Sequence, residues 1–355
     1  MDNIKTTNKL LLIIVVPLIF YLLKLLSFIF IPLVFSMFIA LLFLPLMRWL
    51  NKRKVSRSLS IFVVVLVIIG ALKIGGELIQ LSMAEIRSTE GAFFEKAETK
   101  LQTLLVSFEG IFGIEYVEGE NVLYQFLNKD SIIKNFGLTI DFISGTLTMT
   151  LMTAFFVILW LAESINVQKL LNSTLLKQKH TSVKAFMKIE KDLIKFIKVK
   201  FMISLFTGIG IGLACAFFDV SFPIFWGLFA FVINFVQMIG SFISVILLSL
   251  FAFVELDPTG HLLFFVLLIT GVQVLFGAIL EPIFMGKSFS INIITVLVML
   301  MLLGYIWGVP GLIMAIPITV FIKIILEQFP HTRFIANLIS GKEPKVNLPL
   351  RKKLN

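Results

Sequence analysis

The chain has few polar residues that could do chemistry, and those in its apolar C-terminal half stand out. Only seven of the 128 residues from 201 to 328 are charged. Glu281 is the sharpest candidate, because it ends an apolar stretch and directly precedes Pro282. A charged side chain at the bilayer centre costs ~2.5–3.5 kcal/mol or more, so it tends to be paired or functional. The alternative is a helix-end carboxylate at the water interface, or one that caps a neighbouring helix.

A second polar group interrupts the apolar stretch between residues 223 and 254. Its members are Asn234, Gln237, Gly240 and Ser241. Neither half of this stretch crosses a bilayer comfortably, and breaks at membrane depth are tolerated only where protein or a wet cavity covers them. The pattern predicts a re-entrant helical hairpin whose polar tip suits a neutral, hydroxyl-rich ligand or a dehydrated cation. The alternative is a set of interhelical hydrogen bonds, worth only ~0.6 kcal/mol each.

A third group of glycines and prolines separates two apolar segments near the C-terminus. Gly304, Gly308, Pro310 and Gly311 lie between residues 291–303 and 312–326. This pattern predicts either a second re-entrant hairpin, whose flexible tip lines a pathway, or two short crossings. Glycines four residues apart also permit close helix packing, which is the structural alternative. Gln273, inside an expected span over 262–284, faces either the pathway or a neighbouring helix.

The elements that must position these residues follow from composition. Of 355 residues, 58% are hydrophobic and 15% charged, and mean hydropathy is +1.02. Soluble domains need about 25% charged residues and a wettable surface, so this composition excludes a soluble enzyme, a disordered chain and a disulfide scaffold. It predicts an all-α polytopic integral membrane protein. We expect about six full transmembrane helices or more, two interrupted or re-entrant hairpins and an outer amphipathic helical insert.

Charge distribution divides the chain into five parts. Residues 81–141 carry ten acids and five bases, whereas 163–200 carry nine lysines and three acids. Because basic loops stay in the cytoplasm, both termini are expected inside. Lys73 and Glu77 form an i, i+4 pair near the outer end of the third span. The expected parts are transmembrane helices 1–3 (1–80), an extracytoplasmic amphipathic insert (81–140), a fourth helix with a basic cytoplasmic amphipathic helix (141–200), a core with broken helices (201–328) and a basic cytoplasmic tail (329–355).

Signatures of other protein classes are not found in the sequence. The three histidines are widely separated and Cys215 is the sole cysteine, so no metal-spaced pair exists. A Walker A motif ending at Gly286 and Lys287 would need glycine at position 281, which is Glu281. The net charge of +10 reflects basic cytoplasmic loops rather than a nucleic-acid partner. We therefore expect no enzymatic activity, no bound metal and no cofactor.

Three C-terminal motifs together resemble a known family. They are the run from Phe225 to Ser241, the segment Ile279–Lys287, and the stretch from Gly304 through Pro317 to Gln328. The chain resembles the autoinducer-2 exporter (AI-2E) family of prokaryotic transporters over nearly its whole length, although the family commonly has proline where Gln237 stands here. The resemblance implies a multi-pass secondary transporter of the prokaryotic cytoplasmic (inner) membrane, which works as a homo-oligomer. A pentamer is a guess at its protomer number.

The resemblance leaves the substrate open. Some members are described as exporters of the furanone signal autoinducer-2, used in quorum sensing, and others as sodium or lithium/proton antiporters. We expect secondary transport of a small polar solute such as autoinducer-2, with H+ or Na+ as coupling ion and Glu281 as its candidate carrier. The alternatives are a Na+(Li+)/H+ antiporter, with a monovalent cation as substrate, and an oligomeric channel. A channel should show a continuous polar stripe along one helix, and none is seen.

Overall fold

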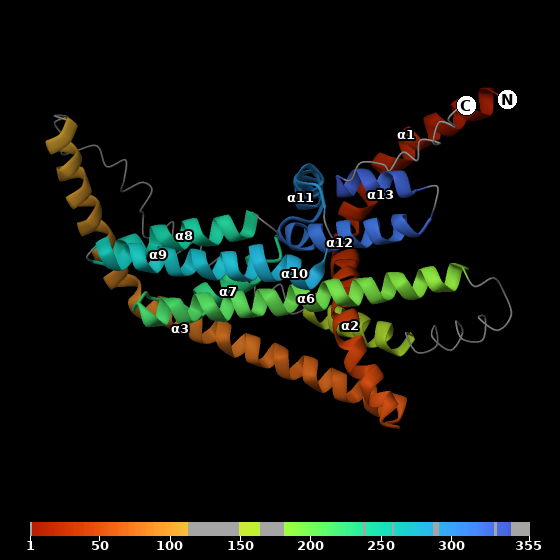
Figure 1. Ribbon diagram of the computed structural model, residues 1–355, viewed down its shortest axis with the longest axis horizontal. Helices are drawn as coiled ribbons and strands as arrows, with labels where there is room; N and C mark the ends of the chain where they lie inside the picture. The colour runs from red at the N-terminus through yellow and green to blue at the C-terminus, as the bar shows by residue number, and fades with distance from the viewer. Residues whose placement is uncertain are drawn as a thin grey trace, which may run out of the picture.

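The computed structural model describes residues 2–112, 149–163, 181–236, 239–257, 259–286, 291–329 and 332–341, and every regular element within them is helical. Five helices are long and apolar enough to cross a membrane, which confirms the all-α, multi-span fold. Figure 1 shows them in an elongated bundle. The elements are α1 (Asp2–Leu25), α2 (Ser27–Lys52), α3 (Arg57–Phe112), α6 (Thr181–Phe217), α7 (Pro223–Ile233), α8 (Ile239–Glu255), α9 (Thr259–Gln273), the π-helix η1 (Val274–Leu280), α10 (Glu281–Met285), α11 (Ile293–Trp307), α12 (Val309–Gln328) and α13 (Arg333–Ser340).

Helix α3 joins two segments that the sequence pattern separates. It is one helix of 56 residues, and the part of it that is long and apolar enough to cross a membrane is Ser58–Ile86. The first part of the amphipathic insert expected over 81–140, as far as residue 112, is therefore a direct continuation of the third expected span. Residues 113–148, which hold the rest of the expected insert and the start of the fourth span, lie outside the described residues.

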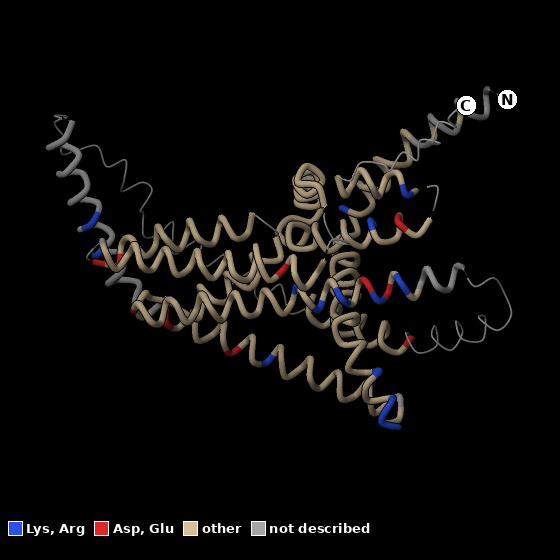
Figure 2. Tube along the Cα trace, viewed as in Figure 1, with Lys and Arg blue, Asp and Glu red and all other residues tan. Residues whose placement is uncertain are grey.

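Charged residues gather mainly at the ends of the long helices. Figure 2 shows α8 and α9 as almost uncharged tubes, with acidic residues where the chain passes from one to the other. At that connection Asp257 pairs with Lys100 of α3. Near the end of α2, Arg48 pairs with Glu190 of α6. These two ion pairs join the N-terminal helices to the C-terminal core.

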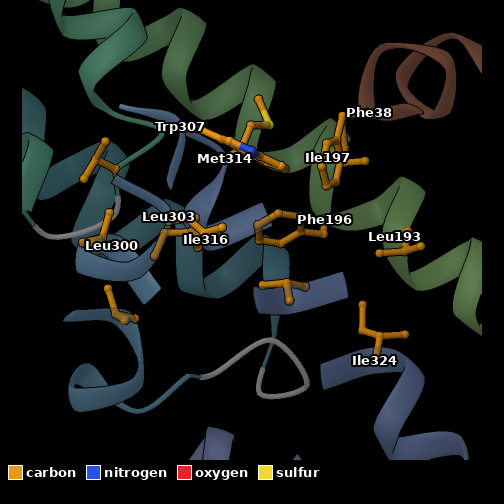
Figure 3. Close-up of a cluster of buried hydrophobic side chains, with 14 of the residues drawn as sticks. Phe38, Leu193, Phe196, Ile197, Leu300, Leu303, Trp307, Met314, Ile316 and Ile324 are labelled. Atoms are coloured by element: carbon orange, nitrogen blue, oxygen red, sulfur yellow. The ribbon is translucent and has the colours of Figure 1, made fainter. Parts of the chain in front are cut away.

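Helix α6 likewise merges two expected elements, the basic amphipathic helix expected at the end of 141–200 and the first apolar segment of the core over 201–328. It is one helix of 37 residues, and the part of it that is long and apolar enough to cross a membrane is Met187–Phe217. The apolar stripe of its first half is buried in a cluster with α12 and the α11–α12 junction, where Ile197 lies near Met314 and Trp307, and Leu193 lies toward Ile324 (Figure 3). The stripe therefore packs into the protein core, and any lysine on the same stripe is buried with it.

Helices α6 and α7 approach closely through small residues. A Cβ atom built on Gly208 would lie 2.6 Å from the carbonyl oxygen of Gly227, and one on Gly227 would lie 2.9 Å from that of Gly208. Only glycine permits backbones to come so near. The short helix α7 is thereby held along α6, so the residue that follows α7 is placed against the same helix.

Both expected helix breaks are present, and each depends on a glycine. A Cβ atom on Gly240 would lie 2.0 Å from the carbonyl oxygen of Ile233, and one on Gly311 would lie 1.9 Å from that of Leu303. At the second break Gly308 adopts a φ of 64°, which side chains disfavour. In Figure 1, α11 is seen almost end-on while α12 lies across the view, so the chain bends sharply there.

Candidate functional site

A buried ion pair lies at the centre of the candidate site. Lys200 Nζ of α6 is 3.0 Å from both Oε1 and Oε2 of Glu281, and the two side chains are 3% and 4% exposed. At 1.5 Å per residue, Lys200 is ~15 Å along α6 from Glu190 and ~25 Å from Phe217. Glu281 is thus a buried, paired carboxylate rather than one exposed to water.

The energetics of such a pair are asymmetric. Taking both charges out of water costs several kcal/mol per ion, which their attraction offsets only when the geometry is good. Two equal contacts to the carboxylate oxygens provide that geometry. Loss of one partner would leave an uncompensated charge, at a cost of about 3–5 kcal/mol. Lys200 and Glu281 are therefore energetically coupled, and any event that neutralises one releases the other.

The first helix break brings an amide to the same strip of α6. Asn234 follows α7 directly, and its Nδ2 donates a hydrogen bond to Ser204 Oγ at 3.1 Å. Ser204 lies four residues after Lys200, so both face the same side of the helix. All four side chains of this group are buried. The polar strip on α6 thus binds the end of α7 through Ser204 and the start of α10 through Lys200.

A second polar cluster lies between α8 and α9. Gln273 Nε2 donates to Ser244 Oγ at 2.8 Å, while the Ser244 hydroxyl donates to the carbonyl oxygen of Ser241 at 3.0 Å. Since the Ser244 hydroxyl already donates its hydrogen to Ser241, its oxygen can only accept from Gln273. The Gln273 amide is therefore oriented with Nε2, rather than Oε1, toward Ser244. Within the described part of the chain, Gln273 Oε1 is buried and has no hydrogen-bond partner. An unpaired buried acceptor costs about 1–3 kcal/mol, so this oxygen favours a donor.

The two clusters are joined by an irregular helix. η1 runs from Val274 to Leu280, exactly filling the interval between Gln273 and Glu281. Pro282 follows, and in a regular α-helix its ring would clash with the carbonyl four residues earlier, which gives a physical reason for the wider turns. Gly277 of η1 faces the first break, since a Cβ built there would lie 3.6 Å from Ser241 Oγ. π-Helical turns occur frequently at functional sites.

The second break lies apart from these polar side chains. Gly304, Gly308, Pro310 and Gly311 are at the α11–α12 junction, where Trp307 Nε1 donates to a carbonyl oxygen of α1 at 3.0 Å. Apolar side chains connect this second break to the region of the Lys200–Glu281 pair. Val236, beside the first break, and Met285, near Glu281, belong to the same buried cluster as Leu303 and Met314.

The predicted residues therefore separate into two groups. The structure brings Asn234, Gly240, Ser241, Gln273, Glu281 and Pro282 to one region, and it places Gly304, Gly308, Pro310 and Gly311 across an apolar cluster from it. Gln237 lies outside the described residues.

Sequence reasoning missed the partners that α6 and α8 contribute. The sequence pattern places Lys200 on the apolar stripe of the basic helix, with Leu193, Phe196 and Ile197, but it predicted neither a partner nor a role for this lysine. A lysine on that stripe, followed at helical spacing by Ser204 and Thr207, was the available signal, and all three are buried. The site thus offers one carboxylate, one ammonium group, two amides and several hydroxyls. These groups suit hydrogen bonding to a polar solute and exchange of a proton.

Comparison with known proteins identifies relatives of the chain. The profile described as "AI-2E family transporter" matches residues 10–331. The protein YhhT of Escherichia coli K12 is 26% identical over 320 residues, or 88% of each chain. The AI-2 transport protein TqsA of the same organism is 33% identical over 152 residues, 41% of this chain and 42% of TqsA. A Borreliella burgdorferi protein is 30% identical over 155 residues, 43% of each chain. The last two matches span less than half of those relatives.

The family profile covers most of the chain, and five of the described helices, among them α6 and the continuous α9–η1–α10 helix, are long and apolar enough to cross a bilayer. The chain is therefore a multi-pass membrane protein that belongs to the AI-2E family of transporters.

Proposed function

We propose that the protein is a secondary transporter of the bacterial inner membrane that exports a small polar solute such as autoinducer-2, with both termini in the cytoplasm. The observation that carries this proposal is the buried Lys200–Glu281 pair beside the Asn234–Ser204 bond at a helix break. Ionisable residues within spans are costly and usually mark solute or ion pathways. Broken helices near the midplane are typical of solute sites in secondary transporters.

The second polar cluster supports a neutral, hydroxyl-bearing solute as the substrate. Gln273 Oε1 is a buried acceptor without a partner in the described part of the chain, and Ser244, which accepts from Gln273 Nε2, links this residue to Ser241 of α8. A solute hydroxyl would satisfy this oxygen and recover the cost of leaving it unpaired. The name of TqsA, which includes AI-2, is consistent with a ligand of this chemistry.

A proton is the coupling ion that the geometry favours. Protonation of Glu281 would remove the charge that holds Lys200 and so loosen the contact between α6 and α10. Na+ would have to displace the Lys200 ammonium and find several oxygen ligands. Na+(Li+)/H+ antiport is the second candidate function, because a carboxylate released from its lysine could bind either a proton or a small cation. An oligomeric channel is a third and weaker alternative.

We also propose that the two helix pairs are re-entrant hairpins. At 1.5 Å per residue, α7 is ~16 Å long, α8 ~26 Å and α11 ~22 Å, whereas the hydrocarbon core is ~30 Å thick. Tight glycine contacts at Gly240 and Gly311 support a chain that turns back at each break. We further propose that the protein works as a homo-oligomer, with five protomers as the number to test.

Transport by purified protein in proteoliposomes tests the proposal. Liposomes loaded with an autoinducer-2 furanone should accelerate uptake of labelled furanone from outside, and a pH gradient should change the rate. Glu281→Gln should abolish the effect of the gradient. Glu190→Gln is the matched control, since it removes a carboxylate from a partly exposed ion pair and should leave transport intact. Na+ or Li+ exchange for H+ without furanone counterflow would support the antiporter, and flux linear in the gradient without exchange would support a channel.

A further inference from the structure

Two lysines of α6 hold the short helix α10, one at each of its ends. At the start of α10, Lys200 Nζ is 3.0 Å from both carboxylate oxygens of Glu281. At its end, Lys195 Nζ donates a hydrogen bond to the carbonyl oxygen of Met285 at 3.0 Å. At 1.5 Å per residue, the two contacts are ~7.5 Å apart along α6 and ~6 Å apart along α10. The chain order is reversed between the two helices, so α10 runs antiparallel to α6 between two matched contacts.

The two contacts differ in how they respond to a proton. A protonated Glu281 has no charge to hold the Lys200 ammonium group, whereas a backbone carbonyl does not titrate. The Met285 carbonyl is at the C-terminal end of α10, since the chain turns away at Gly286 with a φ of 77°. The last carbonyls of a helix lack intrahelical partners and attract cations, so Lys195 satisfies one of them. Protonation of Glu281 therefore releases one end of α10 and leaves the other end bound.

Packing also fixes the Met285 end of the helix. The Met285 side chain is 5% exposed and belongs to the buried apolar cluster that contains Met314. Between the two ends, Ile283 and Phe284 are 66% and 54% exposed, so neither of them fastens α10 to the rest of the described chain. The Glu281 end depends instead on its buried ion pair.

The π-helix η1 connects the releasable end of α10 to both polar clusters. Gln273 precedes η1, and a Cβ atom built on Gly277 within it would lie 3.6 Å from Ser241 Oγ. π-Turns are sites where helices kink, so η1 allows a change of direction beside the ion pair. η1 itself carries no charged residue, and the charged groups of α6 that contact α10 are the two lysines. A turn of α10 about its fixed end would therefore move η1 and the polar groups beside it.

We propose that Lys195 is a positioning residue whose bond to Met285 is the pivot of α10. When Glu281 is neutralised and leaves Lys200, η1 and the start of α10 turn about that bond. This inference rests on the proposed proton coupling and adds the residue that converts loss of the ion pair into a directed movement. Distances between helices show the movement without any solute, so a failure of the pivot and a failure of the transport function give different results.

Spin-label distances test the pivot in a Cys215→Ala background, since Cys215 is the sole cysteine. The reference label replaces Leu72 on α3, a helix that lies on the other side of α6 from α10 in Figure 1. The second label replaces either Ile279 of η1 or Phe284 of α10, which are 47% and 54% exposed. Ile279 is ~9 Å from Met285 along the helix, so a turn of ~20°, the size of a helix kink, moves it ~3 Å.

The two label positions should respond differently to acidification. The distance to Ile279 should shift by ~3 Å, whereas the distance to Phe284, beside the pivot, should change by less than ~1 Å. Equal shifts at both positions, or no shift at either, would overturn the proposal.

Substitution of Lys195 tests its part in the movement. Lys195→Met removes the donor, so the Phe284 label should now shift as far as the Ile279 label, and Lys195→Arg, which keeps a donor, should hold it in place. The matched control is Lys198→Met, because Lys198 is an exposed lysine on the same helix, and it should behave as the parent. A Phe284 label that stays in place in Lys195→Met refutes the pivot even where transport is normal.

The double variant Lys200→Met with Glu281→Gln provides the released state without a change of pH, and it leaves neither charge buried alone. In it, the Ile279 label should be at its acid distance at every pH. In proteoliposomes, Lys195→Met should remove the effect of the pH gradient while the KM for solute stays within twofold of the parent, and Lys195→Arg should restore the effect. An Ile279 label that keeps the parent's neutral-pH distance in the double variant, or gradient-dependent transport by Lys195→Met, would contradict the pivot.

Discussion

Neutralising Glu281 is the most informative perturbation of this protein. Glu281→Gln keeps the shape of the side chain but leaves the Lys200 ammonium group unpaired at 3% exposure. We expect a loss of about 3–5 kcal/mol in the free energy of unfolding, the cost of an uncompensated buried charge. Lys200→Met should cost a similar amount, because it strands the carboxylate instead.

The double variant Lys200→Met with Glu281→Gln distinguishes pairing from simple loss of packing. It removes both charges, and uncharged replacements of a buried pair are often neutral or stabilising. We expect it to be more stable than either single variant, so the interaction energy should be at least ~3 kcal/mol, at or above the top of the range seen for contacting residues. The free energy of unfolding of the parent, the two single variants and the double variant can be measured in mixed micelles, by circular dichroism at increasing SDS.

The same variants test whether the ion pair couples solute transport to the pH gradient. The double variant should fold and bind solute but transport it at a rate that no longer depends on the pH gradient. The reasoning would be refuted if both single variants were within ~0.5 kcal/mol of the parent and their effects added in the double. Transport by the double variant that still follows the pH gradient would remove the pair from the coupling mechanism while leaving its structural role intact.

Three further predictions concern the surroundings of the pair. Gly240→Ala should lower stability by about 1–3 kcal/mol because its Cβ would lie 2.0 Å from a backbone oxygen of α7, whereas Gly277→Ala, with its nearest contact at 3.6 Å, should be close to neutral in the same SDS titration. Gln273→Leu should keep or raise the thermal midpoint, since it removes an unpaired buried oxygen, yet raise the KM for a hydroxyl-bearing solute about tenfold in proteoliposomes, and an unchanged KM would contradict a role in binding. Ser204→Ala should cost about 1–3 kcal/mol by leaving the Asn234 amide unpaired, and Ser204→Thr should recover part of that loss in a thermal-shift assay.

Much of the fold could be predicted because helical membrane proteins obey local rules. Hydropathy identifies apolar segments long enough to span a bilayer, and the backbone must then satisfy its own hydrogen bonds as helix. The two breaks were readable for the same reason, since Gly240 and Gly311 interrupt apolar runs in the sequence. The sequence indicated less clearly where one helix ends and the next begins. α3 and α6 each continue through a change of composition, because charged and apolar residues alike are compatible with helix.

The residues of the candidate site could be identified from local sequence, but their partners could not. The sequence alone identified Glu281, Gln273 and Asn234 as costly polar groups in apolar surroundings. It could not supply their partners, because Lys200 is 81 residues from Glu281 and an amphipathic stripe has the same spacing whether it faces lipid or another helix. Only the packing of α6 against α10 decided that Lys200 is buried and paired. Hydropathy and helix propensity act between near neighbours along the chain, whereas the pairing of two buried charges depends on which helices meet and at what depth.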